Sequence, residues 1–364
     1  MPFILLYSSS LLPALGEKTR EHLQVNPSGM LPVAIINGRV ISESNDIMQE
    51  LEDSFPTYRP LLPPRRSKEE ERVPVLLRLE RRFFSVWFTW LTSRAGDSAA
   101  AEMDKVLKQI DEELKASGGP YFMGSELSLV DCMFAPFLER AAASLPYFKG
   151  FECRSSSYPH LLAWYEAMDS RPSYAALKSD YYTHCKDLPP QIGQCYSLPA
   201  AAPFAAEIDG GSWQLDFEGI EPMLPADKNT AKREAARSLL SNIEAVARFC
   251  SRGVASSGGF SRPSAPLADP NNPGNEAVVP VLDVALRIIA QAMLTDSSSP
   301  KTETSSKDYV LKAGSLQSVG FPAEVVRPSL LYLRDRVGVP RDMSVHAARQ
   351  LRAYINLFLS AIAS

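Results

Sequence analysis

The sequence has few of the residues that build metal centres and disulfide frameworks. Its 364 residues include only five cysteines and four histidines. The cysteines are odd in number and widely spaced, and no two of them have the CxxC spacing of a zinc or redox site. This pattern argues against a disulfide framework, so we expect a reducing compartment inside the cell, with the cytoplasm as the location. We expect no metal site.

Strong charge and long apolar runs are also missing. The formal net charge of -4 is small for a chain of this length. It argues against nucleic acid or an anionic membrane as the main partner. No apolar run comes near the roughly 18 to 20 residues that span a bilayer. The run from Phe3 to Leu6 is too short for a secretory signal, and no basic segment precedes it.

The first 55 residues predict a small α/β unit. Two strand-like runs, residues 31–36 and 39–41, flank Asn37-Gly38, the strongest short signal for a β-hairpin. Residues 44–55 have helical spacing of apolar side chains. A proline-rich stretch near residue 60 then predicts a rigid, extended connection.

The remainder of the chain predicts helices. Residues 69–180 carry several apolar stripes at helical spacing. Ser128-Leu129-Val130-Asp131 has the form of a capping box at the start of one helix. We therefore expect four regions: residues 1–60 and 66–185 as two domains, residues 186–225 as a linker, and residues 226–364 as a helical extension with mobile loops.

Two motifs in this order resemble the soluble glutathione transferase superfamily. The first is residues 26–33, Asn-Pro-Ser-Gly-Met-Leu-Pro-Val, followed by Ile-Ser-Glu-Ser at 41–44. The second is the capping box at Ser128, with Tyr-Phe-Met-Gly at 121–124 before it. The resemblance covers residues 17 to 185 and is closest to the omega, lambda and dehydroascorbate-reductase-like groups. It implies an α+β, mostly α fold: a partial thioredoxin-like domain, an all-α domain and an extra helical region.

The resemblance implies a glutathione site with glutathione as co-substrate. Pro32 corresponds to a proline that follows a cis peptide in this superfamily, so the backbone of Leu31 would pair with the cysteinyl part. Glu43 would face the ammonium of the γ-glutamyl end, and Ser44 would face its carboxylate. Ser44 also stands where a helix should begin, and a helix N-terminus favours an anion. Lys18 matches by spacing a lysine that contacts the glycyl end in omega-like members.

Each of these residues also has a structural interpretation that involves no ligand. Pro32 could be an edge-strand proline, Ser44 an N-cap and Glu43 a first-turn charge, while Lys18 could be a solvated side chain. The aromatic residues Phe83, Phe84 and Trp87 lie on the helix that lines the electrophile pocket in the superfamily. Aromatic residues at helical spacing also form cores, so these residues have both interpretations.

The chain departs from the superfamily at its start. Members open with a strand and a helix that carry the cysteine, serine or tyrosine that activates the thiol of glutathione. Counting back from Lys18, that position would fall before Met1, so the catalytic residue stays unassigned. Either the sequence begins late, in which case a plastid location is also open, or this protein does not have the usual catalytic group.

Two functions follow as hypotheses. The first is a transferase that binds glutathione and uses its thiolate on a small electrophilic or disulfide substrate, for conjugation, thiol transfer or reduction. The second is a catalytically silent binding or scaffold protein that acts through its C-terminal extension. A homodimer is one assembly that the resemblance leaves open.

Overall fold

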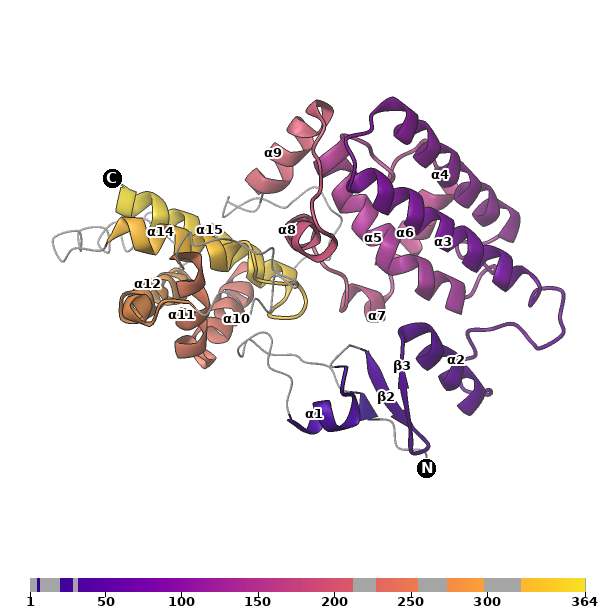
Figure 1. Cartoon of the computed structure of the whole chain (residues 1–364), viewed down its shortest axis with the longest axis horizontal. Helices are drawn as coiled ribbons and strands as arrows, with labels where there is room; N and C mark the ends of the chain where they lie inside the picture. The colour runs from indigo at the N-terminus through magenta and orange to yellow at the C-terminus, as the bar shows by residue number, and fades with distance from the viewer. Residues whose placement is uncertain are drawn as a thin grey trace. The chain divides into compact units, whose positions relative to one another are not determined.

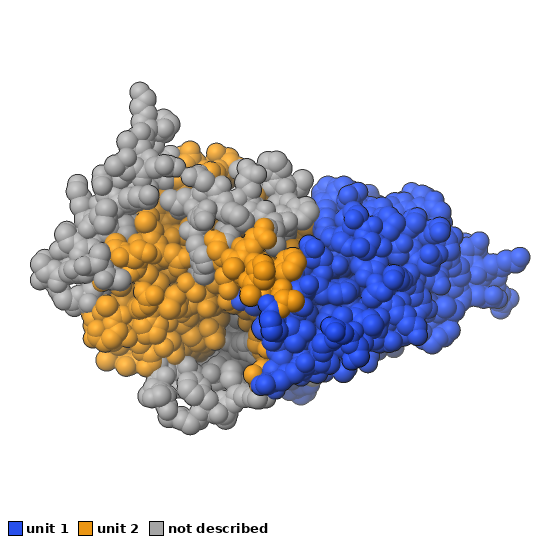
Figure 2. All heavy atoms as spheres, turned by 90° about the horizontal axis from the view of Figure 1, so that it is seen from above, with its two compact units in different colours: residues 1–10, 17–174, 196–199 blue, residues 11–16, 175–195, 200–364 orange. Residues whose placement is uncertain are grey.

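A computed structural model describes residues 5–6, 20–28, 32–211, 227–254, 274–297 and 322–363. The chain forms two compact units, coloured blue and orange in Figure 2. Unit 1 comprises residues 1–10, 17–174 and 196–199. Unit 2 comprises residues 11–16, 175–195 and 200–364.

Unit 1 begins with a small antiparallel sheet in the order β1-β2-β3. Its strands are β1 (Leu5–Leu6), β2 (Val33–Ile36) and β3 (Arg39–Ser42), beside helices α1 (Arg20–Val25) and α2 (Ser44–Ser54) (Figure 1). Asn37 and Gly38 have φ values of 51° and 79°. A two-residue turn of this kind needs positive φ at both positions, so the predicted hairpin is confirmed.

The sheet is held to α2 by a few apolar contacts. Ala34 and Ile36 of β2 are fully buried and pack against Ile47 of α2. Val33 of β2 stands opposite Ser42 of β3 in the register of the hairpin. Pro32 precedes Val33 and Glu43 follows Ser42, so these two residues lie next to each other at the open end of the hairpin.

The rest of unit 1 is helical, as the sequence predicts. The connection after residue 55 consists mostly of turns and bends rather than the extended chain that the sequence predicts. It leads into a group of helices that Figure 1 shows packed together. These are α3 (Arg72–Leu91), α4 (Asp97–Ser117), α5 (Leu129–Lys149) and α6 (Pro159–Asp169), followed by the short α7 (Pro172–Ala175). Gly118 and Gly150, with φ of 73° and 67°, end α4 and α5 in the left-handed conformation that glycine adopts at low cost.

The predicted capping box is present at the start of α5. The Asp131 carboxylate accepts the backbone N–H of Ser128 at 2.8 Å and its hydroxyl at 2.6 Å. The same carboxylate, which is fully buried, also accepts the Phe122 N–H at 3.0 Å and the Trp164 indole N–H at 2.8 Å. Asp131 therefore caps α5 and also links this helix to the preceding turn and to α6.

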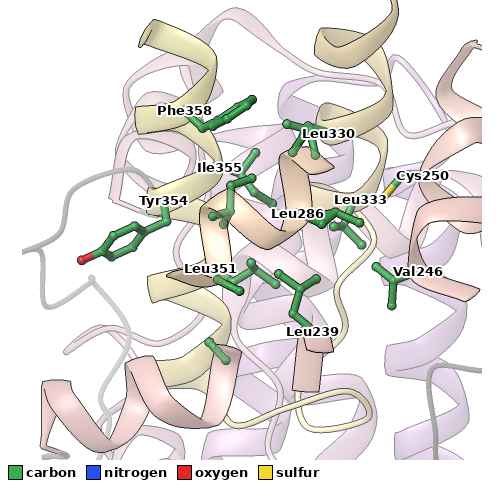
Figure 3. Packing of buried hydrophobic residues seen from close by; sticks show 14 of the residues in the cluster. Leu239, Val246, Cys250, Leu286, Leu330, Leu333, Leu351, Tyr354, Ile355 and Phe358 are labelled. Atoms are coloured by element: carbon green, nitrogen blue, oxygen red, sulfur yellow. The ribbon is translucent and has the colours of Figure 1, made fainter. Parts of the chain in front are cut away.

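Unit 2 is a helical bundle with its own core. Its helices are α8 (Tyr181–Ile192), α9 (Ala202–Gly211), α10 (Lys228–Ser241), α11 (Ile243–Ser251), α12 (Val279–Ser297), α14 (Ala323–Arg334) and α15 (Val345–Ala363). Figure 3 shows side chains of the last five helices meeting in one cluster, with Leu286, Leu330 and Ile355 inside it. A separate hydrophobic core explains why this part is compact without residues from unit 1.

Two details differ from the sequence-based expectation. The segment expected as a linker, residues 186–225, contains the end of α8 and all of α9, and its residues 212–225 lie outside the described ones. Within the expected helical extension, the apolar spacing of residues 231–250 predicts one helix, but the chain is broken at Asn242, whose φ of -146° and ψ of 48° are not helical. Apolar periodicity continues across such a break, so the pattern alone does not reveal it.

One helix corrects the expectation about apolar length. Residues 276–295, which include most of α12, are long and apolar enough to cross a membrane by those two criteria. However, Leu282, Leu286 and Ile289 of α12 are fully buried in the core of unit 2. The charged residues Asp283 and Arg287 lie on the outer face of α12. They form an i,i+4 ion pair, with 2.7 Å between the guanidinium and the carboxylate. These contacts are those of a core helix in a bundle.

Candidate functional site

The candidate site lies where β3 passes into α2. Glu43 separates the last residue of β3 from Ser44, the first residue of α2, and it is the N-cap with φ of 76° and ψ of 121°. A non-glycine residue rarely adopts this conformation, which costs on the order of 1 to 3 kcal/mol and is typical of functional sites. The Glu43 carbonyl accepts the Ile47 N–H at 3.0 Å, so the strained residue begins the helix directly.

The side chains at this position are free to bind a ligand. Glu43 and Ser44 are both exposed, and neither side chain has a hydrogen-bond partner among the described residues. The first N–H groups of α2 and the positive end of its dipole favour an anion beside Ser44. The Glu43 carboxylate favours a cation next to it. A group that carries both charges, such as the ammonium and carboxylate of an amino acid, matches this arrangement.

Asn45 is a residue at this position that sequence reasoning missed. Its side-chain Oδ1 is buried and has no hydrogen-bond partner among the residues that the structure describes. An unpaired buried acceptor costs free energy unless a donor reaches it. The sequence gives only a weak signal for this residue, a short polar side chain in the first turn of an expected helix.

Of the five predicted glutathione ligands, three belong to the described residues. Pro32, Glu43 and Ser44 are exposed and lie at the open end of the β2–β3 hairpin. Lys18 and Leu31 lie outside the described residues, and so does the peptide bond predicted to be cis before Pro32. The structure thus brings the described members of the predicted set to one place.

The aromatic residues predicted for a substrate pocket divide into two groups. Phe83 and Trp87 are at most 1% exposed, and the Trp87 indole donates to the Ser144 hydroxyl at 3.0 Å. Both are therefore core residues of unit 1, and Trp87 joins α3 to α5 through its bond to Ser144. Phe84 is only half-buried and packs edge-on against Phe137 with ring centroids 4.9 Å apart.

Four of the cysteine thiols do not have the lowered pKa that a catalytic cysteine needs. Burial, with the nearby Asp131 carboxylate adding to it, raises the pKa of Cys132 to about 11. Burial also raises the pKa of Cys153 to about 11, and it raises the pKa values of Cys185 and Cys250. A catalytic cysteine needs a lowered pKa, because the thiolate is the nucleophile. The described residues also contain no group of acidic, histidine or cysteine side chains that could hold a metal ion.

A groove of about 910 Å³ lies in unit 1, but not at this site. Residues from the second half of α2, the connection after it and α3 line the groove. Neither Glu43 nor Ser44 is among the residues that line it. The candidate site is therefore an exposed surface of described residues at the opposite end of α2.

Comparison with known families matches two separate parts of the chain. Residues 5–54 match the glutathione S-transferase N-terminal domain. Residues 74–167 match the glutathione S-transferase C-terminal domain. These two ranges contain the hairpin, the candidate site, α4, α5 and most of α3 and α6, whereas α8 to α15 lie beyond them.

Curated relatives agree with the domain matches. Glutathione S-transferase L3 of Arabidopsis thaliana is 33% identical over 159 residues, which are 43% of this chain and 64% of that protein. A stringent starvation protein A homolog of Pasteurella multocida is 34% identical over 123 residues, 32% of this chain and 55% of that protein. The chain thus spans 64% of the length of the first relative and 55% of the length of the second.

Among solved structures, glutathione transferase Omega 3C from Trametes versicolor is similar to this chain. The two are 26% identical, the match covers 43% of this chain and 71% of that chain, and the TM-score is 0.37.

Proposed function

Since this chain belongs to the glutathione transferase superfamily, we propose that it binds reduced glutathione at the start of α2. The observation that carries the proposal is the conformation of Glu43 and Ser44. Their side chains are exposed and have no hydrogen-bond partner in the part of the chain that the structure describes, and Glu43 is held at φ of 76°. In this proposal, Ser44 and the first N–H groups of α2 bind the γ-glutamyl carboxylate, and Glu43 binds the ammonium. Pro32 and the backbone of Leu31 bind the cysteinyl part, and Lys18 binds the glycyl end.

The proposed chemistry is that of the superfamily: the thiolate of glutathione serves conjugation, thiol transfer or reduction of a small electrophilic or disulfide substrate. The raised pKa values of Cys132, Cys153, Cys185 and Cys250 support glutathione, rather than any of these four thiols, as the source of the thiolate. A cytoplasmic location and a homodimer are part of this proposal. A rice relative that is 28% identical is named as a cytosolic protein, which supports the location.

The alternative is a silent binding protein that acts through its C-terminal extension. Unit 2 favours this alternative because it has a core of its own, and because its helices α8 to α15 lie beyond both domain matches. The two functions differ in one measurable property, which is turnover of an electrophile by the glutathione-bound chain.

Calorimetric titration with reduced glutathione tests the proposal. We expect weak binding by the full chain and a loss of at least tenfold in affinity for both Glu43→Gln and Ser44→Ala, since each leaves one ligand charge without its partner. Glu126→Gln is the matched control, because Glu126 is an exposed glutamate at a distance in sequence from the hairpin. Binding that none of these variants changes would contradict the site. A conjugation assay with 1-chloro-2,4-dinitrobenzene on the same samples separates the enzyme from the silent protein.

A further inference from the structure

The groove in unit 1 is distinct from the candidate glutathione site. Its volume of about 910 Å³ is in the range of small-molecule sites, roughly 300 to 1,000 Å³. From α2 it takes Gln49, Glu52 and Asp53. With a rise of about 1.5 Å per residue, these positions lie roughly 8 to 14 Å along the helix from Ser44. The groove and the glutathione site thus use opposite ends of the same helix.

The walls of the groove are already fixed without a ligand. Five lining residues are prolines, whose rings lock φ: Pro56, Pro60, Pro63, Pro64 and Pro74. The connection is also tied to its neighbours, because the Glu52 carboxylate accepts the N–H groups of Leu61 at 2.8 Å and Leu62 at 3.2 Å. The Leu61 carbonyl in turn accepts the N–H of Leu129 at 2.8 Å. A ligand would therefore pay little ordering cost on binding.

The groove offers an apolar floor and few donors. Leu62, Val73, Leu77 and Leu129 line it, and Val73 and Leu129 are buried. The prolines have no N–H, and the N–H of Val73 is bonded to the Glu70 carbonyl at 3.2 Å. The one lining cation, Arg65, is paired with Asp53 at 2.6 Å. An anion would find few free hydrogen-bond donors here.

The carboxylates of the groove outnumber its cations. Glu52, Asp53 and Glu70 line it together with Arg65. After the Asp53–Arg65 pair is formed, Glu52 and Glu70 remain, and each is half-buried beside apolar walls that strengthen its field. We propose that the groove binds a small amphipathic organic cation, with an apolar body on the leucine floor and a protonated amine at Glu52 and Glu70. This binding does not depend on the proposed binding of glutathione.

A fluorescent amine tests the proposal on the full chain. Dansylcadaverine combines an apolar fluorophore with a protonated amine, and its emission rises in apolar surroundings. We expect saturable binding that weakens as sodium chloride is added, because an exposed charge pair is screened. Saturating glutathione should not displace the probe, and Ser44→Ala should not weaken it. Failure of the glutathione site and failure of the groove are therefore measured separately.

Substitutions that keep the fold identify the groove as the site. Glu70→Gln retains an oxygen for the Arg66 N–H that Glu70 accepts, and should weaken the probe about three- to tenfold, as expected for one partly exposed charge pair. The double variant Glu70→Gln/Glu52→Gln should bind the probe more weakly still, and Leu77→Lys should abolish binding of the probe. Glu71→Gln is the matched control, because this exposed neighbour does not line the groove.

Two results would overturn the proposal. One is equal binding of neutral dansylamide or of the anion 8-anilinonaphthalene-1-sulfonate, since either would show that the amine is not recognised. The other is an affinity for dansylcadaverine that Glu70→Gln, the double variant and Leu77→Lys all leave unchanged.

Discussion

The guanidinium of Arg352 in α15 lies 2.5 Å from the carboxylate of Asp180, 172 residues earlier in the chain, and both side chains are at most 1% exposed. Arg352 also donates to the Thr183 hydroxyl at 2.8 Å and to the Val337 carbonyl at 2.9 Å. Asp180 is the N-cap of α8, whose Thr183 N–H it accepts at 3.1 Å. This pair fastens α8 to the bundle of unit 2.

We expect Arg352→Ala to lower the free energy of unfolding by about 3 to 5 kcal/mol, because Asp180 would remain as a buried charge without its partner. Arg352→Lys should restore little, because an ammonium cannot make the same forked set of bonds. The double variant Asp180→Asn/Arg352→Met should lose less than Arg352→Ala alone. Chemical denaturation of the three variants measures these differences, and equal loss in all of them would contradict the coupling.

The same pair has a defined pH dependence. Burial raises the pKa of Asp180, but the ion pair and hydrogen bonds with Arg352 and Thr183 outweigh burial, and the pKa is lowered overall. A lowered folded-state pKa means that the contribution is fully present above the unfolded carboxyl pKa of about 3.9 and is lost as the pH falls through the lower folded value. Wild type should therefore lose stability in acid more steeply than the double variant, as urea titrations below pH 5 would show.

The capping box gives a second prediction. Ser128→Ala should cost about 1 kcal/mol through the lost cap. Asp131→Ala should cost about 3 kcal/mol, because it leaves the buried donors of Phe122 and Trp164 without an acceptor. Asp227→Ala, at the exposed N-cap of α10, is the control and should cost about 1 kcal/mol. Similar values for Asp131 and Asp227 would show that the extra bonds contribute nothing.

Local signals in the sequence predicted much of unit 1. Asn37-Gly38 predicted the hairpin because few other residue pairs readily adopt positive φ at both positions. Ser128 and Asp131 predicted the start of α5 because a capping box is a short-range motif. The resemblance in turn placed Pro32, Glu43 and Ser44, which the hairpin register brings together.

Features that depend on distant contacts could not be predicted. The arginines of the tail suggest a solvated or salt-bridged surface, yet Arg352 is fully buried because its partner, Asp180, lies in another helix. The groove likewise depends on how α2, the proline connection and α3 meet. The additional bonds of Asp131 come from Phe122 and Trp164, whose positions no local pattern specifies.

The strained conformation of Glu43 gives a third prediction. At φ of 76°, glycine is favoured over alanine, so Glu43→Gly should be about 1 kcal/mol more stable than Glu43→Ala. Both variants should lose glutathione affinity, because both lack the carboxylate. Within α2, Glu50→Gly and Glu50→Ala are the control pair, and there glycine should be less stable by about 1 kcal/mol. The same sign at both positions would contradict a strained Glu43.

The last prediction concerns the thiols and separates this chain's own cysteines from that of glutathione. Burial, complete for Cys153, Cys185 and Cys250 and partial for Cys132, raises the pKa values of these four thiols, so almost none of each is thiolate at neutral pH. We expect iodoacetamide at pH 7.5 to leave these four unmodified in the folded protein and to alkylate all of them in denaturant, as mass spectrometry of peptides would show. Rapid alkylation of any one of the four in the folded chain would identify an activated thiol. It would then replace glutathione as the expected nucleophile, and glutathione binding at Ser44 would have to serve a different step.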